Sequence, residues 1–259
     1  MRYHLGDSMA TFAIGDIHGW RPPLDELLAS LRPRLTPADT VVFLGDYIDR
    51  GDDVKGCIDA VLAFKREAAA RVVCLVGNHE EWLLRAMRDP SHHSWLLAMD
   101  GFTTIRSYSP EAERAIRDAA AAAGRDLLNG TALPYDLFFD AMPLEHQEFL
   151  ASLDRYCQTP DSICSHAGVH PTIADLGRQG KLLTWGHAGF PEEYAGEAYV
   201  MYGHHNDPDV DAAGWPRPRI LGRTIGVDTI SHGVLSAVAL PGPQVFQSTR
   251  YPPAIRVRG

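Results

Sequence analysis

Short apolar runs followed by a glycine and a polar side chain recur along the first third of the chain. Residues 11–14, 41–44 and 71–76 are nearly continuous in apolar side chains. A run of this kind is typical of a strand that is covered on both faces of its sheet. The three runs are followed, in order, by Gly15-Asp16, Gly45-Asp46 and Gly77-Asn78. We therefore predict three buried strands, each ending beside a side chain that can bind a metal ion.

Helical spacing separates these runs. Apolar side chains at Leu24, Leu27, Leu28 and Leu31 recur on one helix face, and Pro33 ends that segment. The same spacing recurs in residues 54–62. An order of strand, helix and strand predicts right-handed parallel crossovers. In a sheet built this way, functional side chains gather at the carboxyl ends of the strands.

The remainder of the chain is predicted to be helical from about residue 82 to 160 and then to return to strands. Ser109 and Pro110 predict the start of one helix, and Gly124 predicts its end. Strand patterns follow at 162–165, 199–202, 220–227, 234–240 and 244–248, the last two as an antiparallel hairpin. We find no linker and predict one domain, residues 1–259, with a helical insertion at about 82–160.

Composition narrows the class of protein. The 259 residues include 45% hydrophobic and 22% charged side chains, which excludes a disordered chain and a coiled coil. No apolar run is long enough for a membrane span, and the first ten residues lack the layout of a secretory signal. The net charge of −9 argues against nucleic acid as a partner. Four cysteines without a C-x-x-C pair predict buried thiols. We expect a cytoplasmic protein with no membrane or nucleic-acid partner.

The polar side chains that follow the predicted strands form a candidate metal site. Carboxylate, amide and imidazole ligands together suit borderline divalent ions such as Mn²⁺, Fe²⁺ or Zn²⁺. Six ligands are too many for one catalytic ion with an open position, so they predict two ions bridged by one carboxylate. Two carboxylates leave a surplus of about two positive charges on such a pair, which matches a phosphate dianion. The six candidates are Asp16, His18, Asp46, Asn78, His166 and His204.

Three further side chains adjoin the candidate ligands. The guanidinium of Arg50 is suited to hold two phosphate oxygens. His79 directly follows Asn78 and is placed to protonate a leaving oxygen. Asp49 is a candidate to hold His79 in the required tautomer. We predict His79, Asp49 and Arg50 as the catalytic group.

These segments carry a family resemblance. Gly15-Asp-Ile-His-Gly19, Gly45-Asp-Tyr-Ile-Asp-Arg-Gly51 and Gly77-Asn-His-Glu80 resemble the three signatures of calcineurin-like metallophosphoesterases, in the bacterial serine/threonine phosphoprotein phosphatase branch. Ser165-His166-Ala167-Gly168 and Gly203-His204 resemble the two later metal-binding motifs. The resemblance implies an α/β fold in four layers, a metallophosphatase-type β-sandwich of two mixed sheets flanked by helices.

The resemblance also implies a role for each candidate. Asp16 and His18 would bind the first ion, and Asp46 would bridge to the second. Asn78 and the two later histidines would complete the coordination of the second ion. The reaction implied is attack on a phosphoester by a hydroxide that bridges the two ions. We expect Mn²⁺, with iron or zinc as alternatives.

One position departs from the family pattern. Bacterial members carry a second phosphate-binding arginine after a Leu-Leu-Trp sequence, and here alignment of Trp185 and Phe190 puts His187 at its place. We therefore predict weaker phosphomonoester binding, or binding that strengthens when His187 is protonated. Substrate binding is assigned to Arg50, Asn78 and His187. The sequence leaves open whether Arg217, Arg219 or Arg223 compensates.

The substrate class is the least determined part of the prediction. The first hypothesis is a phosphatase acting on phosphoserine or phosphothreonine in proteins, and a small phosphoester substrate stays open. The alternatives are a bis(5′-nucleosyl)-tetraphosphatase and a non-catalytic relative that binds phosphorylated partners. The complete ligand set argues against the third. Glu80 is predicted to support the turn or the helix start, and Trp82, Trp95 and Trp185 are predicted to be core residues.

Overall fold

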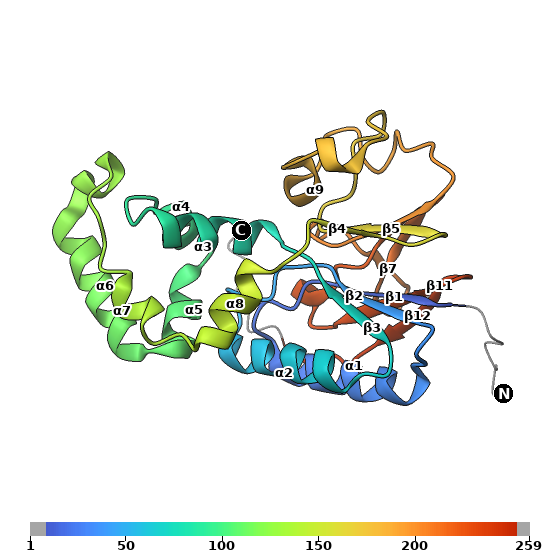
Figure 1. Cartoon of the computed structure of the whole chain (residues 1–259), viewed down its shortest axis with the longest axis horizontal. Helices are drawn as coiled ribbons and strands as arrows, with labels where there is room; N and C mark the ends of the chain where they lie inside the picture. The colour runs from blue at the N-terminus through green and yellow to red at the C-terminus, as the bar shows by residue number, and fades with distance from the viewer. Residues whose placement is uncertain (1–8, 253–259) are drawn as a thin grey trace.

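The computed structural model describes residues 9–252 and contains two five-stranded sheets packed face to face, with helices outside them (Figure 1). The first sheet has the order β12-β11-β1-β2-β3. Its central strands β1, β2 and β3 run parallel, and β11 and β12 form an antiparallel hairpin at one edge. The predicted parallel pairing of the first three strands and the predicted hairpin are confirmed. The bounds are β1 Thr11–Ile14, β2 Thr40–Phe43, β3 Arg71–Cys74, β11 Ser236–Leu240 and β12 Gln244–Gln247.

The second sheet has the order β4-β5-β6-β10-β9, with β5, β6 and β10 parallel between two antiparallel edge strands. The single strand predicted at 220–227 is wrong. The segment forms two strands because Gly222, at φ +58°, turns the chain back between them. β4 also lies inside the stretch predicted to be helical. The bounds are β4 Tyr156–Gln158, β5 Ser162–Ser165, β6 Tyr199–Tyr202, β9 Arg219–Leu221 and β10 Thr224–Gly226, and a separate ribbon pairs β7 Asp209–Val210 with β8 Pro216–Arg217.

Helices α1 Arg21–Leu31 and α2 Val54–Glu67 cover the outer face of the first sheet, and the short helix α9 Leu182–Trp185 lies over the second (Figure 1). The chain between β3 and β4 is helical and extends to one side of the sheets (Figure 1). The side chain of Ser109 caps α6, whose last residue precedes Gly124, as predicted. The helices of this segment are α3 Asn78–Arg88, α4 Ser94–Ala98, α5 Gly101–Tyr108, α6 Pro110–Ala123, α7 Asp136–Phe139 and α8 Leu144–Ala151.

Alternating side chains of the strands build three apolar layers. In β1, Phe12 and Ile14 pack toward the helices, whereas Ala13 packs into the layer between the sheets. A third cluster, which includes Val200 and Tyr202, covers the outer face of the second sheet. The four-layer α/β sandwich is confirmed. The cysteines are free and buried, as predicted.

The predicted domain includes residues 1–8 and 253–259, which lie outside the described residues, and the single-domain assignment stays a prediction. Among residues 9–252, no helix combines the length and the apolar character required to cross a bilayer.

Candidate metal centre

The carboxyl ends of five strands bring the six candidate ligands together. The loops after β1, β2 and β3 supply Asp16 with His18, then Asp46, then Asn78, and the loops after β5 and β6 supply the two later histidines. Five of the six are buried, and His204 is half-buried. Residues that are up to 188 positions apart therefore meet at one edge of the sandwich.

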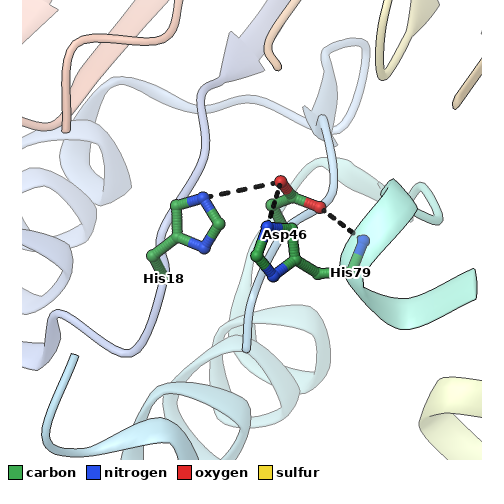
Figure 2. Close-up of side chains that lie close together, drawn as sticks. All are labelled: His18, Asp46 and His79. Carbon is green, nitrogen blue, oxygen red and sulfur yellow. Dashed lines mark hydrogen bonds and ion pairs between the residues drawn. The ribbon is translucent and has the colours of Figure 1, made fainter. Parts of the chain in front are cut away.

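Asp46 lies at the centre of this cluster. Its carboxylate belongs to two groups whose potential ligand atoms all lie within 4.8 Å of one another: His18, Asp46 and His79 in one, and Asp46, His166 and His204 in the other. Figure 2 shows the carboxylate between His18 and His79, with Nε2 of these rings 3.5 and 3.8 Å from Oδ2. A shared carboxylate is what a bridged pair of ions requires.

The hydrogen bonds of His166 test whether a cation fits this position. The carbonyl of Leu44 lies 2.9 Å from Nδ1, and burial lowers the pKa of this ring to about 3, so it is neutral and carries one proton. When that proton is donated to Leu44, Nε2 presents a lone pair to Oδ1 of Asn78 at 2.9 Å. Two lone pairs that converge in this way are suited to a cation, and a carbonyl partner on the other nitrogen is usual for metal-binding histidines.

His18 repeats this arrangement on the other side of Asp46. Its Nδ1 lies 2.9 Å from the carbonyl of Ile48, and its Nε2 faces Asp46 and, at 4.0 Å, Asp16. Burial and then the charge of Arg50 lower the pKa of His18 well below its ordinary value. The ring is therefore neutral at physiological pH, as a metal ligand must be.

The acidic side chains of the cluster repel one another. Burial, followed by the charges of Asp228 and Asp46, raises the pKa of Asp16 well above its usual range. Burial also raises the pKa of Asp228 to about 6. Divalent cations would relieve this repulsion, so the donor set fits a metal centre on electrostatic grounds as well. The sequence analysis missed Asp228, which follows β10 and lies outside the five signature motifs.

Backbone strain is concentrated at this cluster. Within residues 9–252, six residues other than glycine have positive φ, and five of these belong to the predicted site. Left-handed backbone costs such residues roughly 1–3 kcal/mol each, so the surrounding packing must hold them there. The five are His18, Asp46, Asp49, Arg50 and His204.

Two glycines allow the carboxylates to approach the backbone. A Cβ at Gly77 would lie 2.0 Å from Oδ1 of Asp46, and a Cβ at Gly203 would lie 2.0 Å from Oδ1 of Asp16. Any larger residue at either position would displace a predicted ligand.

Glu80 holds the loop that carries Asp46. Its Oε2 accepts hydrogen bonds from the amides of Asp46 (3.0 Å) and Gly77 (2.9 Å). Its Oε1 accepts from the amides of Tyr47 (2.9 Å) and Ile48 (3.3 Å). The prediction that Glu80 supports the turn and the helix start is confirmed.

Glu80→Gln tests this support. Whichever way the amide is turned, its NH₂ group faces two backbone N–H donors, so we expect the free energy of unfolding to fall by about 2 kcal/mol. Urea unfolding of the metal-free protein measures the loss. The exposed Glu67→Gln is the control and should be within experimental error of the parent. Equal stability of the Glu80 variant would show that the four hydrogen bonds do not hold the loop.

His79 and Asp49 form a buried pair beside Asp46. Nδ1 of His79 lies 2.6 Å from Oδ2 of Asp49, and Nε2 lies 3.2 Å from a terminal nitrogen of Arg50. Burial lowers the pKa of His79 to about 4 and raises the pKa of Asp49 well above its usual range. The geometry brings the predicted catalytic group together. Because the Arg50 guanidinium lies next to Nε2, a second cation bound at that nitrogen would be repelled.

Two residues of the helical segment fix Asp49, and the sequence analysis missed both roles. Nε1 of Trp95 donates to both carboxylate oxygens at 3.0 Å, and Oγ1 of Thr104 donates to Oδ1 at 2.5 Å. Thr104 also accepts from the Asp49 amide at 2.9 Å. They lie on different helices, α4 and α5, so no spacing along the chain relates them to Asp49.

The contacts of His187 are with residues other than the predicted metal ligands. Its ring is 4.1 Å from that of His170, and its Nδ1 accepts from the Gly189 amide at 3.0 Å. Its role in substrate binding stays a prediction. The three arginines that were left open have other partners: Arg217 pairs with Asp211, Arg219 pairs with Asp207 and Glu192, and Arg223 stacks on Tyr199.

The tryptophans divide into two kinds. Trp95 is fully buried, as predicted. Trp82 is half-buried but packs against the main core, in line with the prediction. The core assignment is wrong for Trp185, which is half-buried at the end of the short helix α9, with its ring centroid 4.8 Å from that of Trp82.

A largely buried His and Asp cluster at the carboxyl ends of the strands of an α/β sandwich is suited to bind divalent metal ions, as metal-dependent hydrolases do. The chain belongs to the calcineurin-like phosphoesterase family, whose sequence profile matches residues 9–230. The family match was expected from the signature motifs and is confirmed.

Two named proteins match parts of the chain in sequence. It is 28% identical over 119 residues to the zinc-dependent endopolyphosphatase of Saccharomyces cerevisiae, a match that covers 44% of this chain. It is 38% identical over 97 residues to serine/threonine-protein phosphatase 1 of Salmonella typhimurium, which covers 36% of this chain. The matches span 35% of the yeast protein and 41% of the Salmonella protein, less than half of either.

Solved structures confirm the fold. A crystal structure described as that of a candidate diadenosine tetraphosphatase superposes with a TM-score of 0.60 at 19% identity, covering 95% of this chain and 96% of its own. A cold-active protein tyrosine phosphatase superposes with a TM-score of 0.52 at 15% identity, covering 89% and 73%. At these identities the likeness concerns the fold alone.

Proposed function

We propose that the protein hydrolyses phosphoserine and phosphothreonine esters in proteins, using two divalent ions, with Mn²⁺ as the expected metal. The observation that carries the proposal is the pair of ligand groups that share Asp46, directly beside the His79–Asp49 pair and Arg50. The partial identity to the Salmonella serine/threonine phosphatase supports the substrate class.

Each ligand has a place in this proposal. Asp16 and His18 would hold one ion, Asn78, His166 and His204 would hold the other, and Asp46 would be a ligand of both. When bound, the ions supply positive charge to the phosphate and make a nucleophile available near neutral pH. The buried carbonyls of Leu44 and Ile48 keep the two flanking imidazoles turned toward Asp46.

Arg50 and His79 act on the substrate. The Arg50 guanidinium binds phosphate oxygens and holds the ester next to the His79 ring, 3.2 Å away. When a phosphate dianion occupies Arg50 and Asp49 accepts from Nδ1, the negative charge favours the protonated ring of His79. Nε2 would then deliver its proton to the departing ester oxygen, which a serine or threonine alkoxide needs because it is a poor leaving group. Asp49 accepts from Nδ1 and stabilises the protonated ring, and Trp95 and Thr104 keep Asp49 in place.

The charges of the site favour one phosphate group. Two divalent ions, less Asp16 and Asp46, leave about two positive charges, equal to one phosphate dianion. The negative charge of Asp228 and the positive charge of Arg50 cancel in this count. Arg217, Arg219 and Arg223 are engaged elsewhere, so a tetraphosphate would bring more negative charge than these side chains match.

Phosphorus NMR tests the substrate class. Manganese-loaded protein is offered a phosphoserine peptide and diadenosine tetraphosphate in one tube, and the two resonances are followed together. We expect orthophosphate from the peptide while the dinucleotide stays intact. Release of ADP before orthophosphate would replace the proposal with the bis(5′-nucleosyl)-tetraphosphatase alternative. No turnover of either compound would contradict both.

A further inference from the structure

A pocket outside the metal centre lies between the start of α1 and the loop that precedes α2. Its volume is about 420 Å³, which is within the range of pockets that bind small ligands. We call it the α1 pocket, and the proposed reaction uses none of the residues that line it. Its walls are mainly prolines and aromatic rings: Trp20, Pro22, Pro23, Tyr251 and Pro252.

Most polar groups of the α1 pocket already have partners. Arg21 donates to Asp25 at 2.6 Å and to a backbone carbonyl of α2. The hydroxyl of Tyr251 donates to Glu26 at 3.1 Å. The carboxylate of Asp53 accepts from a backbone amide of α2 at 2.9 Å and so caps that helix. These groups have little hydrogen-bonding capacity left for a ligand.

Two polar groups of the α1 pocket have no partner within residues 9–252. Nε1 of Trp20 is buried without an acceptor there, and only 5% of this residue is exposed. The carboxylate of Asp52 is exposed and forms no ion pair or hydrogen bond with a residue of that range. A buried N–H group without an acceptor is rare in native proteins, so it indicates that another molecule supplies the acceptor.

The free donor and the free carboxylate lie on the same side of the α1 pocket. Cδ1 of Trp20, which is bonded to Nε1, is 2.5 Å from the position that a Cβ of Gly51 would take. The indole edge that carries the N–H group therefore packs on Gly51, and Asp52 is the next residue of the chain. A ligand that fits both groups has a carbonyl oxygen close to a positive charge.

We propose that the α1 pocket binds a proline-rich segment of a partner protein with an arginine or lysine beside the prolines. A segment in the polyproline II conformation leaves its carbonyl oxygens free and has no N–H group at its prolines, so it matches a site with one free donor. Its rings pack on Trp20 and Tyr251, because aromatic-lined grooves are the usual binding sites of such segments. Its cation pairs with Asp52.

Charge favours a basic segment over an acidic one. Asp52 and Asp53 both line the α1 pocket, and the one cation that lines it, Arg21, is paired with Asp25. Three carboxylates therefore surround one guanidinium, which leaves a negative surplus. A phosphorylated or acidic segment would be repelled, and an arginine or lysine would be attracted.

The α1 pocket is next to the metal centre but separate from it. The Gly51 amide donates to the carbonyl of His18 at 2.8 Å, and the Asp53 amide donates to the carbonyl of Gly19 at 3.1 Å. The loops that carry metal ligands thus also form one wall of the α1 pocket. A partner bound there would be held beside the metal centre without occupying it, and its binding does not depend on the proposed reaction.

Fluorescence anisotropy tests the proposal with a labelled peptide that contains two Pro-x-x-Pro repeats and one flanking arginine. We expect saturable binding to the intact chain. Replacing the arginine with glutamate, which turns an ion pair into a repulsion, should weaken binding by about tenfold, and Asp52→Asn should remove most of this difference. Trp20→Phe keeps an aromatic face but removes the N–H group, so it should weaken binding by about fivefold, the size of one hydrogen bond. The controls Trp82→Phe and Asp209→Asn should bind as the parent does.

The indole N–H resonances of the five tryptophans show where the peptide binds. The resonance that is missing in Trp20→Phe should move as peptide is added to the parent, and the resonance that is missing in Trp82→Phe should not. If Trp20→Phe lowers the stability, the exposed Asp52→Asn still tests the site. The proposal would be overturned by the absence of saturable binding, by equal binding of a peptide with alanine in place of every proline, or by a Trp20 resonance that does not move.

Discussion

Asp46→Asn is expected to abolish the proposed phosphatase activity, with a loss of more than roughly a thousandfold, because this one carboxylate would serve both ions of the proposed centre. Asp46 is the residue common to both ligand groups, and its oxygens face His18 and His166 at 3.5 Å. An amide keeps the shape of the side chain but removes the negative charge and one of the two ligand oxygens. Phosphate release and metal content are measured on the same preparation.

Thermal unfolding separates loss of metal from loss of fold. Metal that binds only the native state raises the Tm, so Mn²⁺ should stabilise the parent and not the variant. Without metal the variant should be no less stable than the parent, because Asp46 raises the pKa of the buried carboxyls around it and its removal relieves that repulsion. The exposed Asp25→Asn should behave as the parent in both assays. If the variant kept two ions and half of the parent's activity, the proposal that Asp46 bridges the ions would be contradicted.

Much of this centre could be predicted because its signals are local. Each early ligand follows a continuous apolar strand, and the carboxyl ends of parallel strands meet at one edge, so Asp16, Asp46 and Asn78 were expected to lie together. Helix boundaries were equally local: Ser109 and Gly124 mark the two ends of α6 by capping and by positive φ. These features depend on interactions between residues that are close together in the sequence, so the sequence is sufficient to predict them.

The features that escaped prediction depend on contacts across the fold. Trp95 and Thr104 reach Asp49 from 46 and 55 residues away, and their helices meet only in the packed structure. The ring of Trp82 contacts that of Trp185, which lies more than a hundred residues later in the chain. A strand pattern at 220–227 gives no sign of the reversal at Gly222, because one glycine inside an apolar run is compatible with a strand or a turn.

His79→Asn is expected to lower kcat on a phosphoserine peptide by about a hundredfold to ten thousandfold, the usual range for loss of a general acid. On 4-nitrophenyl phosphate, whose leaving group needs no proton, we expect a loss of at most about tenfold. The variant should retain its full metal content. His232→Asn, at the short helix after β10, is the control and should leave both rates unchanged.

The contrast between the two substrates determines which role His79 has. Its Nε2 lies 3.8 Å from Oδ2 of Asp46, within reach of the first ligand group, so distance alone would also permit a metal ligand. A ligand would lower the metal content when removed and would reduce both rates by the same factor. A proton donor leaves the metal in place and matters only where the departing oxygen is basic. The Arg50 guanidinium, 3.2 Å from that nitrogen, repels a metal ion there but not a phosphate ester that is about to accept a proton, which is why we expect the second result.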